Sequence, residues 1–171
     1  GANLALNIAD NGYHVAVYNR TQSRTEAFAA AAGPLSDRVT ATATLEDFVA
    51  AIKPPRPVII MVQAGDPVDE QIAALKPLLQ DSDIIIDAGN ANFRDTMRRF
   101  ENLNGNGPGF VGMGVSGGAE GARHGPSIMV GGAEADWRRI EPVLTAISAK
   151  YKGEPCAAWL GDNGAGHFVK T

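Results

Sequence analysis

The stretch VIIMVQAGDPVDEQIAALKPLLQDSDIIID, residues 58–87, decides the fold class. It begins with the apolar run 58–62 and ends with a second run, 84–87. Short continuous apolar runs are typical of strands that are covered on both faces. Between them, Asp66 provides a helix cap and Pro67 a proline at the first helical position, which predicts a helix from 66 to about 80. The stretch therefore predicts a strand–helix–strand unit.

The same alternation continues on both sides of this unit. The further strands are expected at 13–18, 39–43 and 157–160, and the further helices at 2–10, 23–32, 45–52, from about 93, and 135–150. This alternation predicts an α/β fold with a Rossmann-like, doubly wound, mostly parallel sheet and helices on both faces. In such a sheet, ligands bind beyond the carboxyl ends of the strands. We expect one domain over 1–163 and the start of a further helix over 164–171.

Composition excludes several classes of function. The chain has 15 basic and 19 acidic residues, a net charge of −4, which argues against non-specific binding to nucleic acid. No apolar run has the roughly 18 residues that a membrane span needs. The single cysteine, Cys156, rules out an internal disulfide and indicates a reducing, cytoplasmic compartment. With three histidines besides that cysteine, we expect no metal site.

A candidate nucleotide-binding signal lies in residues 19–21, Asn-Arg-Thr, at the end of the strand predicted over 13–18. In a dinucleotide fold, the residue about 20 positions after the first glycines contacts the ribose. A carboxylate there would bind a 2′-hydroxyl, whereas Arg20 favours a 2′-phosphate, as in NADP. Gly1, directly before the first helix, is the only position left for a glycine of the fingerprint.

The glycine-rich stretch 111–132 allows two interpretations. Residues 114–118, GVSGG, match the G-x-S-x-G nucleophile elbow of hydrolases, with Asp136 or Asp162 and then His167 in the required order. An elbow leads into a well-formed helix, and the sequence after Ser116 is poor helix material. A loop whose serine and backbone N–H groups bind a carboxylate or hydroxyl suits the composition better.

The last candidate site is the segment GAGHFVK, residues 164–170. Lys170 follows Gly166 by four positions, so both lie on one side of the predicted helix. A lysine beside a cofactor could act as a general base. His124 and His167 are expected to be surface or hydrogen-bonding residues.

Together these segments resemble the decarboxylating 6-phosphogluconate dehydrogenases. The resemblance extends over nearly the whole chain, in the order of that family. The motifs that carry it are 1–9 (GANLALNIA), 18–21 (YNRT), 84–90 (IIIDAGN), 94–99 (RDTMRR), 114–118 (GVSGG), 121–127 (GARHGPS) and 164–170 (GAGHFVK).

The resemblance implies an NADP-dependent oxidation of 6-phosphogluconate at its C3 hydroxyl, with loss of CO₂ to give ribulose 5-phosphate. It implies that Lys170 is the general base and that Ser116, Gly117 and Gly118 contact the substrate. Asn90 would contact both substrate and nicotinamide. The cofactor-binding residues would be Gly1, Asn19, Arg20, Thr21, Val62, Gln63, Ala64 and Asn90. A homodimer is implied for the full-length protein.

The chain departs from the family pattern at three places. Ala119 stands where a glutamate is usual, Val130 where a proline is usual, and Ala88 where a glycine is usual. Both ends look cut: we expect the first strand and its glycines, and the helical domain after Thr171, to lie outside this sequence. The alternatives are a β-hydroxyacid dehydrogenase acting on a smaller 3-hydroxyacid, and a nucleotide-binding module without catalysis.

Overall fold

The computed structural model describes all 171 residues, Gly1–Thr171. The α-helices are α1 (Ala2–Asp10), α2 (Gln22–Ala30), α3 (Leu45–Ala50), α4 (Asp66–Leu75), α5 (Phe93–Leu103), α6 (Gly118–His124), α7 (Glu134–Ile147) and α8 (Ala165–Lys170), with 3₁₀ helices η1 (Gly33–Arg38) and η2 (Lys76–Leu78). The strands are β1 (Val15–Val17), β2 (Val39–Ala41), β3 (Pro57–Ile60), β4 (Ile84–Asp87), β5 (Gly109–Ser116), β6 (Ser127–Gly131), β7 (Lys150–Tyr151), β8 (Glu154–Pro155) and β9 (Ala157–Trp159). None of the helices has the length and apolar character needed to traverse a lipid bilayer.

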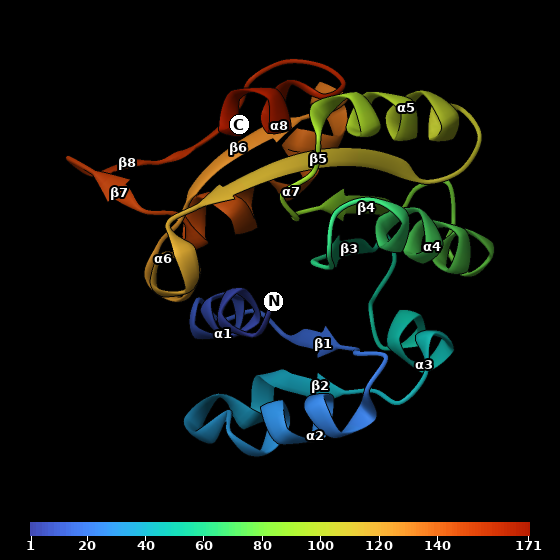
Figure 1. The fold of residues 1–171 in the computed structure, drawn as a ribbon. Helices are drawn as coiled ribbons and strands as arrows, with labels where there is room; N and C mark the ends of the chain where they lie inside the picture. The colour runs from blue at the N-terminus through green and yellow to red at the C-terminus, as the bar shows by residue number, and fades with distance from the viewer.

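A five-stranded sheet in the order β3-β4-β5-β6-β9 forms the centre of the molecule. Its neighbours are parallel except for β5 and β6, which are antiparallel. The parallel pair β1–β2 forms a separate sheet, and Figure 1 shows it with α2 below the larger sheet. The predicted fold class, a Rossmann-like, mostly parallel sheet with helices on both faces, is confirmed.

Alternate residues of β4 face two different hydrophobic clusters. Ile84 and Ile86 point into a cluster with α1, α6 and α7, whereas Ile85 points into a cluster with α3, α4 and α5. These three isoleucines are at most 1% exposed, because helices cover both sheet faces. The continuous apolar run in the sequence follows from this two-sided burial.

Several element boundaries differ from those predicted. The first strand begins at Val15, not at 13, and β3 ends at Ile60, so Val62 lies in the loop after it. Helix α4 ends at Leu75 and the chain continues in η2 around Pro77, because a proline cannot donate the hydrogen bond that an α-helix needs. Helix α7 ends at Ile147 rather than at the predicted 150, and a hairpin of β7 and β8, which was not predicted, follows it.

Candidate functional site

The predicted cofactor and substrate residues lie on the exposed surface of the molecule. Most of them lie in the loops after β1, β3 and β4 or at the junction of β5 and α6, whereas Gly1 precedes α1 and Lys170 ends α8. The exposed ones are Gly1, Asn19, Arg20, Thr21, Val62, Gln63, Ala64, Asn90, Ser116, Gly117 and Gly118. Two surface hollows lie elsewhere, where strands of the large sheet begin, lined by Pro57, Ile84 and Gly109 among others.

Lys170 and Asn90 meet at this surface. Nζ of Lys170 donates a hydrogen bond to Oδ1 of Asn90 over 2.5 Å. Lys170 is at the end of α8, and Asn90 is in the loop between β4 and α5. The predicted base and the predicted shared contact residue are therefore neighbours, although 80 positions separate them in the sequence.

Glycines allow α8 to lie directly on the sheet. A Cβ on Gly112 would come within 2.9 Å of the His167 ring, and one on Gly114 within 2.5 Å of Cβ of Lys170. Gly131, which pairs with Gly112 across β5 and β6, would meet the backbone N of Gly166 in the same way. Three glycines of the glycine-rich stretch therefore serve helix packing, not ligand contact.

The loops after β3 and β4 touch at Val62 and Gly89. A Cβ on Gly89 would lie 3.1 Å from the carbonyl oxygen of Val62, so the two loops are packed backbone to backbone. Gly1 lies beside Met61, the residue that follows β3. The structure thus brings Gly1, Val62, Asn90 and Lys170 into one region.

Residues 19–21 are not joined to that region by any hydrogen bond or ion pair. Oδ1 of Asn19 accepts a hydrogen bond from the backbone N of Thr21 at 2.8 Å, which forms a tight Asx turn after β1. Arg20, at the centre of the turn, is exposed and takes part in none of the ion pairs of the structure. Its guanidinium is available for an anion.

A helix follows Ser116, which the sequence analysis did not expect. Strand β5 ends at Ser116, Gly117 and Gly118 have φ of +132° and +65°, and α6 starts at Gly118. Helix α6 is held from outside: Asn3 donates to the carbonyl of Ala119 at 2.9 Å, and buried Asn7 to that of Ala122 at 3.1 Å. These tertiary bonds outweigh the poor helix propensity of the segment.

The prediction that no helix follows Ser116 is therefore wrong, but the left-handed turn lies at Gly117 and Gly118, and Ser116 is part of the strand, unlike the serine of a nucleophile elbow. The triad itself is also absent. Nδ1 of His167 is hydrogen-bonded to Oγ1 of Thr96 at 2.7 Å, and its Nε2 has no partner. Asp136 packs against Gly109, at the opposite end of β5 from Ser116. No histidine is hydrogen-bonded to the serine, which excludes the Ser–His arrangement.

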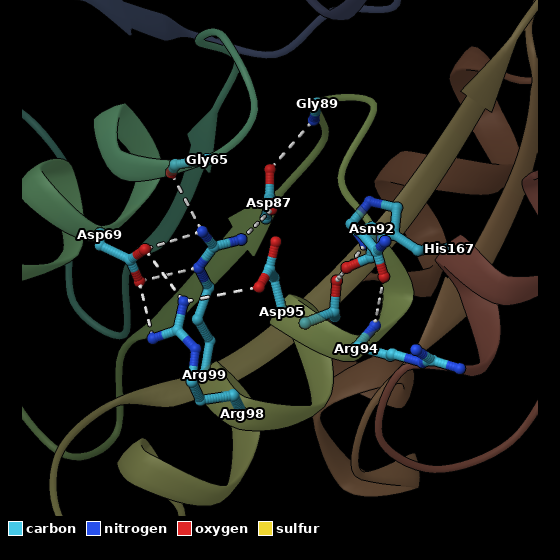
Figure 2. Close-up of polar contacts among 11 residues, drawn as sticks. Gly65, Asp69, Asp87, Gly89, Asn92, Arg94, Asp95, Arg98, Arg99 and His167 are labelled. Atoms are coloured by element: carbon cyan, nitrogen blue, oxygen red, sulfur yellow. Dashed lines mark hydrogen bonds and ion pairs between the residues drawn. The ribbon is translucent and has the colours of Figure 1, made fainter.

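Sequence reasoning missed a cluster of charged side chains around the buried Arg99, shown in Figure 2. Arg99, which is 2% exposed, donates from Nε and Nη2 to the two carboxylate oxygens of Asp69, both at 2.9 Å. Its Nη2 also donates to the carbonyl of Gly65 at 3.0 Å, and its Nη1 lies 3.9 Å from Oδ2 of Asp87. Arg99 therefore connects Gly65 and the start of α4 to the last residue of β4. The one signal in the sequence is Asp87, a charged residue that ends an otherwise apolar strand.

These contacts shift the titration of the groups involved. The hydrogen bond from Arg99 is the main reason that the pKa of Asp69 lies far below its usual range, and Asp69 in turn raises the pKa of Arg99. Burial lowers the pKa of His167, against an opposing effect of Asp87. A pKa below the usual value favours the neutral form of His167 at pH 7.

The three departures from the family pattern lie in different environments. Ala88 and Val130 are 3% and 0% exposed, within the core cluster of α1, α6 and α7. Ala119 is exposed in the first turn of α6, next to Gly118. Only Ala119 alters the surface of the candidate site.

Comparison with known sequences gives one consistent family. The family model for the NAD binding domain of 6-phosphogluconate dehydrogenase matches residues 1–161. The chain is 51% identical over 170 residues to 6-phosphogluconate dehydrogenase, decarboxylating 1 of Saccharomyces cerevisiae, and 52% identical over 171 residues to the corresponding protein of Haemophilus influenzae. Each alignment covers 99% of this chain, which spans 35% of the length of each relative.

Comparison with solved structures agrees. The 6-phosphogluconate dehydrogenase of Plasmodium falciparum, solved in apo form and in complexes with its cofactor NADP⁺ and its substrate 6-phosphogluconate, matches 99% of this chain with a TM-score of 0.94 and 36% identity; 36% of that chain is covered. The 3-hydroxyisobutyrate dehydrogenase of Mycobacterium tuberculosis matches 99% of this chain and 53% of its own, with a TM-score of 0.81 and 24% identity, and shares the fold.

Proposed function

This chain belongs to the family of the NAD binding domain of 6-phosphogluconate dehydrogenase, and we propose that it is the NADP-binding domain of a decarboxylating 6-phosphogluconate dehydrogenase. The reaction is oxidation of the C3 hydroxyl of 6-phosphogluconate and loss of CO₂ from the 3-keto product, which gives ribulose 5-phosphate. The observation that carries the proposal is the Lys170–Asn90 hydrogen bond at the exposed end of the sheet.

Lys170 is the proposed general base. Its Nζ takes the proton of the C3 hydroxyl while the hydride leaves C3, so that a carbonyl forms. Asn90 fixes Nζ by accepting a hydrogen bond, which leaves the other positions on the nitrogen for the substrate. Ser116, with the backbone N–H groups of Gly117 and Gly118, binds the polar groups of the sugar acid. These three residues are exposed at the junction between β5 and α6.

The residues present fit NADP better than NAD. NADP⁺ supplies the hydride acceptor when it is bound. The turn at Asn19–Thr21 has no carboxylate to repel a 2′-phosphate, and it presents the unpaired guanidinium of Arg20. The exposed loop of Val62, Gln63 and Ala64 would hold the nicotinamide half beside Asn90. We therefore assign the 2′-phosphate to Arg20 and the redox end to the Lys170 region.

A β-hydroxyacid dehydrogenase is the second candidate, and the observations favour it less. The 3-hydroxyisobutyrate dehydrogenase shares the fold at 24% identity, whereas the 6-phosphogluconate dehydrogenases of yeast and Haemophilus are 51% and 52% identical. Two of the three departures from the pattern are buried, where they affect packing and not the substrate surface.

The test is an assay of the full-length protein that carries this domain. It should reduce NADP⁺ with 6-phosphogluconate and release one CO₂ per NADPH, while 3-hydroxyisobutyrate and L-serine are poor substrates. Faster oxidation of a 3-hydroxyacid would support the β-hydroxyacid dehydrogenase. Binding of NADP⁺ without oxidation of any of these compounds would support the non-catalytic module.

The proposal also covers the isolated chain and the assembly. We expect the 171-residue chain alone to form no ribulose 5-phosphate, because it spans about a third of the length of its relatives. We expect the full-length protein to be a homodimer, which light scattering measures directly. Product formation by the isolated chain would contradict the first expectation, and a monomeric mass the second.

A further inference from the structure

His167 is a fully buried histidine one helical turn before Lys170. Its side chain is 0% exposed, and its Nδ1 is 2.7 Å from Oγ1 of Thr96 on α5. Thr96 is also 0% exposed. The ring lies over Gly112 of β5, where a side chain would collide with it. Contacts with α5 and β5 therefore fix the ring, and with it the end of α8.

The same ring borders the loop that carries Asn90. Oγ1 of Thr96, which is hydrogen-bonded to the ring, is also 3.3 Å from the backbone carbonyl oxygen of Asn92, two residues after Asn90. Oδ1 of Asp87 accepts a hydrogen bond from the backbone N of Gly89 at 3.1 Å, which shapes the turn directly before Asn90. His167 is thus connected through Thr96 to the segment that carries Asn90, and Figure 2 shows His167 on the side of Asn92.

A histidine is a costly choice for this position. Nε2 of His167 is buried and makes no hydrogen bond of ordinary geometry, and Oδ2 of Asp87 is approached only by Nη1 of Arg99, at 3.9 Å. Buried polar atoms without partners are rare in folded proteins, because each loses its hydration. An apolar side chain of similar size would fill the same space without that loss. Packing alone therefore does not account for a histidine here.

We infer that His167 is a positioning residue that holds Lys170 against Asn90 through its hydrogen bond to Thr96. This rests on the proposed function, in which the Lys170–Asn90 pair performs the proton transfer. A hydrogen-bonding atom at the δ position of the side chain is needed to hold Lys170 in place, because Nδ1 is the atom that bonds to Thr96 on α5.

The test compares His167→Asn with His167→Gln in the full-length protein. Asparagine places an amide where Nδ1 lies and keeps the bond to Thr96, whereas glutamine places its amide one carbon further out. Two readouts are measured: the rate of Lys170 acetylation by a short pulse of an N-hydroxysuccinimide ester, read by peptide mass spectrometry, and kcat with KM for NADP⁺.

For His167→Gln we expect Lys170 acetylation to rise about fivefold, the factor that corresponds to loss of one ordinary contact. We expect kcat to fall roughly 10- to 100-fold with KM for NADP⁺ unchanged, because a small displacement of a catalytic group has effects of that size. His167→Asn should restore most of both. Thr96→Val should reproduce the glutamine variant from the other side of the bond, and Thr96→Ser should not.

Two controls separate positioning from loss of stability. His124→Gln changes an exposed histidine on α6, and Val49→Ala opens a cavity in the cluster of α3 and α4, away from α8. The inference is overturned if His167→Asn and His167→Gln have the same Lys170 acetylation rate and the same kcat. It is also overturned if the kcat of these variants falls only in step with their melting temperature, as in Val49→Ala, while Lys170 acetylation is unchanged. If the wild-type protein oxidises no sugar phosphate, the proposed function fails, and the acetylation rates still decide whether His167 holds Lys170.

Discussion

Lys170 and Asn90 form a hydrogen bond between Nζ and Oδ1 across 80 residues of sequence. The bond joins the end of α8 to the loop after β4. Helix α8 packs on β5, and β4 lies next to β5 in the sheet. In the proposed reaction this pair is the centre of proton transfer.

Lys170→Met should remove activity without removing the cofactor. The methionine has a similar length and no amine, so a general base is lost while packing on Gly114 is kept. General base catalysis contributes roughly 10²- to 10⁴-fold, and we expect kcat to fall by that factor. The measurement is steady-state kinetics of NADPH formation, with the Kd of NADP⁺ from fluorescence titration. Lys53→Met, at an exposed position before the cis proline pair, serves as control. A loss below tenfold would mean that another group is the base.

Arg20→Ala should weaken NADP⁺ binding far more than NAD⁺ binding. Loss of a hydrogen bond to a charged group costs roughly 1.5–3 kcal/mol, which is about 10- to 100-fold in Kd. NAD⁺ has no 2′-phosphate, and its Kd should change less than about twofold. Titration calorimetry of the full-length protein measures both values. Arg24→Ala, exposed on the neighbouring helix α2, should leave the ratio unchanged. Equal losses for the two cofactors would contradict the assignment of Arg20.

The larger sheet was predictable from sequence because its strands are buried on both faces. The run Ile84, Ile85 and Ile86 is apolar throughout, so it lacks the pattern of polar and apolar residues that an amphipathic helix has. Asp66 with Pro67 marks the start of the helix. The positions of Asn90 and Ser116 after strands followed from the same pattern. Hydrophobic periodicity and helix caps depend on residues close together in the sequence, so these features could be predicted without knowledge of the fold.

The remaining features depend on contacts between distant residues. Helix α6 exists because Asn3 and Asn7 bind its carbonyls from α1, and nothing within 118–124 signals that. The glycines at 112, 114 and 131 suggested a ligand, yet they make room for α8. The burial of Arg99, on a helix rich in charged residues, could not be predicted from the sequence either, because its partner Asp69 is 30 residues away.

Asp69→Asn should lower stability in a pH-dependent manner. Since the pKa of Asp69 is depressed in the folded state, its contribution is complete above its unfolded pKa of about 4 and disappears as the pH falls below that value. The Asp69 side chain is 36% exposed, so we expect a loss of about 1 kcal/mol at pH 7 after allowing for solvent screening. Urea unfolding of both proteins between pH 3 and pH 7 measures the difference, which should shrink toward the acid end. Asp37→Asn, exposed in η1, should show no such trend.

Asp83→Ala should destabilise the fold independently of the site. The fully buried carboxylate accepts hydrogen bonds from the backbone N of Arg56 at 2.6 Å and of Gln80 at 2.7 Å, and pairs with the Arg56 side chain at 3.3 Å. Removal leaves these donors unpaired, which typically costs about 3–5 kcal/mol. For a chain of this size, that is a fall in melting temperature of roughly 6–20 °C by calorimetry. A change below 3 °C would show that solvent replaces the lost acceptor.

Gly114→Ala should separate the packing role of the glycine-rich stretch from ligand binding. The new Cβ would lie 2.5 Å from Cβ and 2.8 Å from Cγ of Lys170, atoms too close to the backbone of α8 to swing aside. Helix α8 must shift, at an overpacking cost of about 1–3 kcal/mol, and Lys170 moves with it. We therefore expect a fall in kcat of at least about tenfold, with Kd for NADP⁺ unchanged, and a melting temperature lower by roughly 2–12 °C.

Gly121→Ala is the matched control for this substitution. Gly121 is a helical glycine in the same stretch, and its nearest neighbour, the carbonyl oxygen of Ser116, would be 3.7 Å from the new Cβ. Alanine is a better helix former than glycine, so this variant should be stabilised by up to about 1 kcal/mol and keep its kcat. If Gly114→Ala loses stability but keeps kcat, the position of α8 does not govern the proton transfer, and the general base must be sought outside that helix.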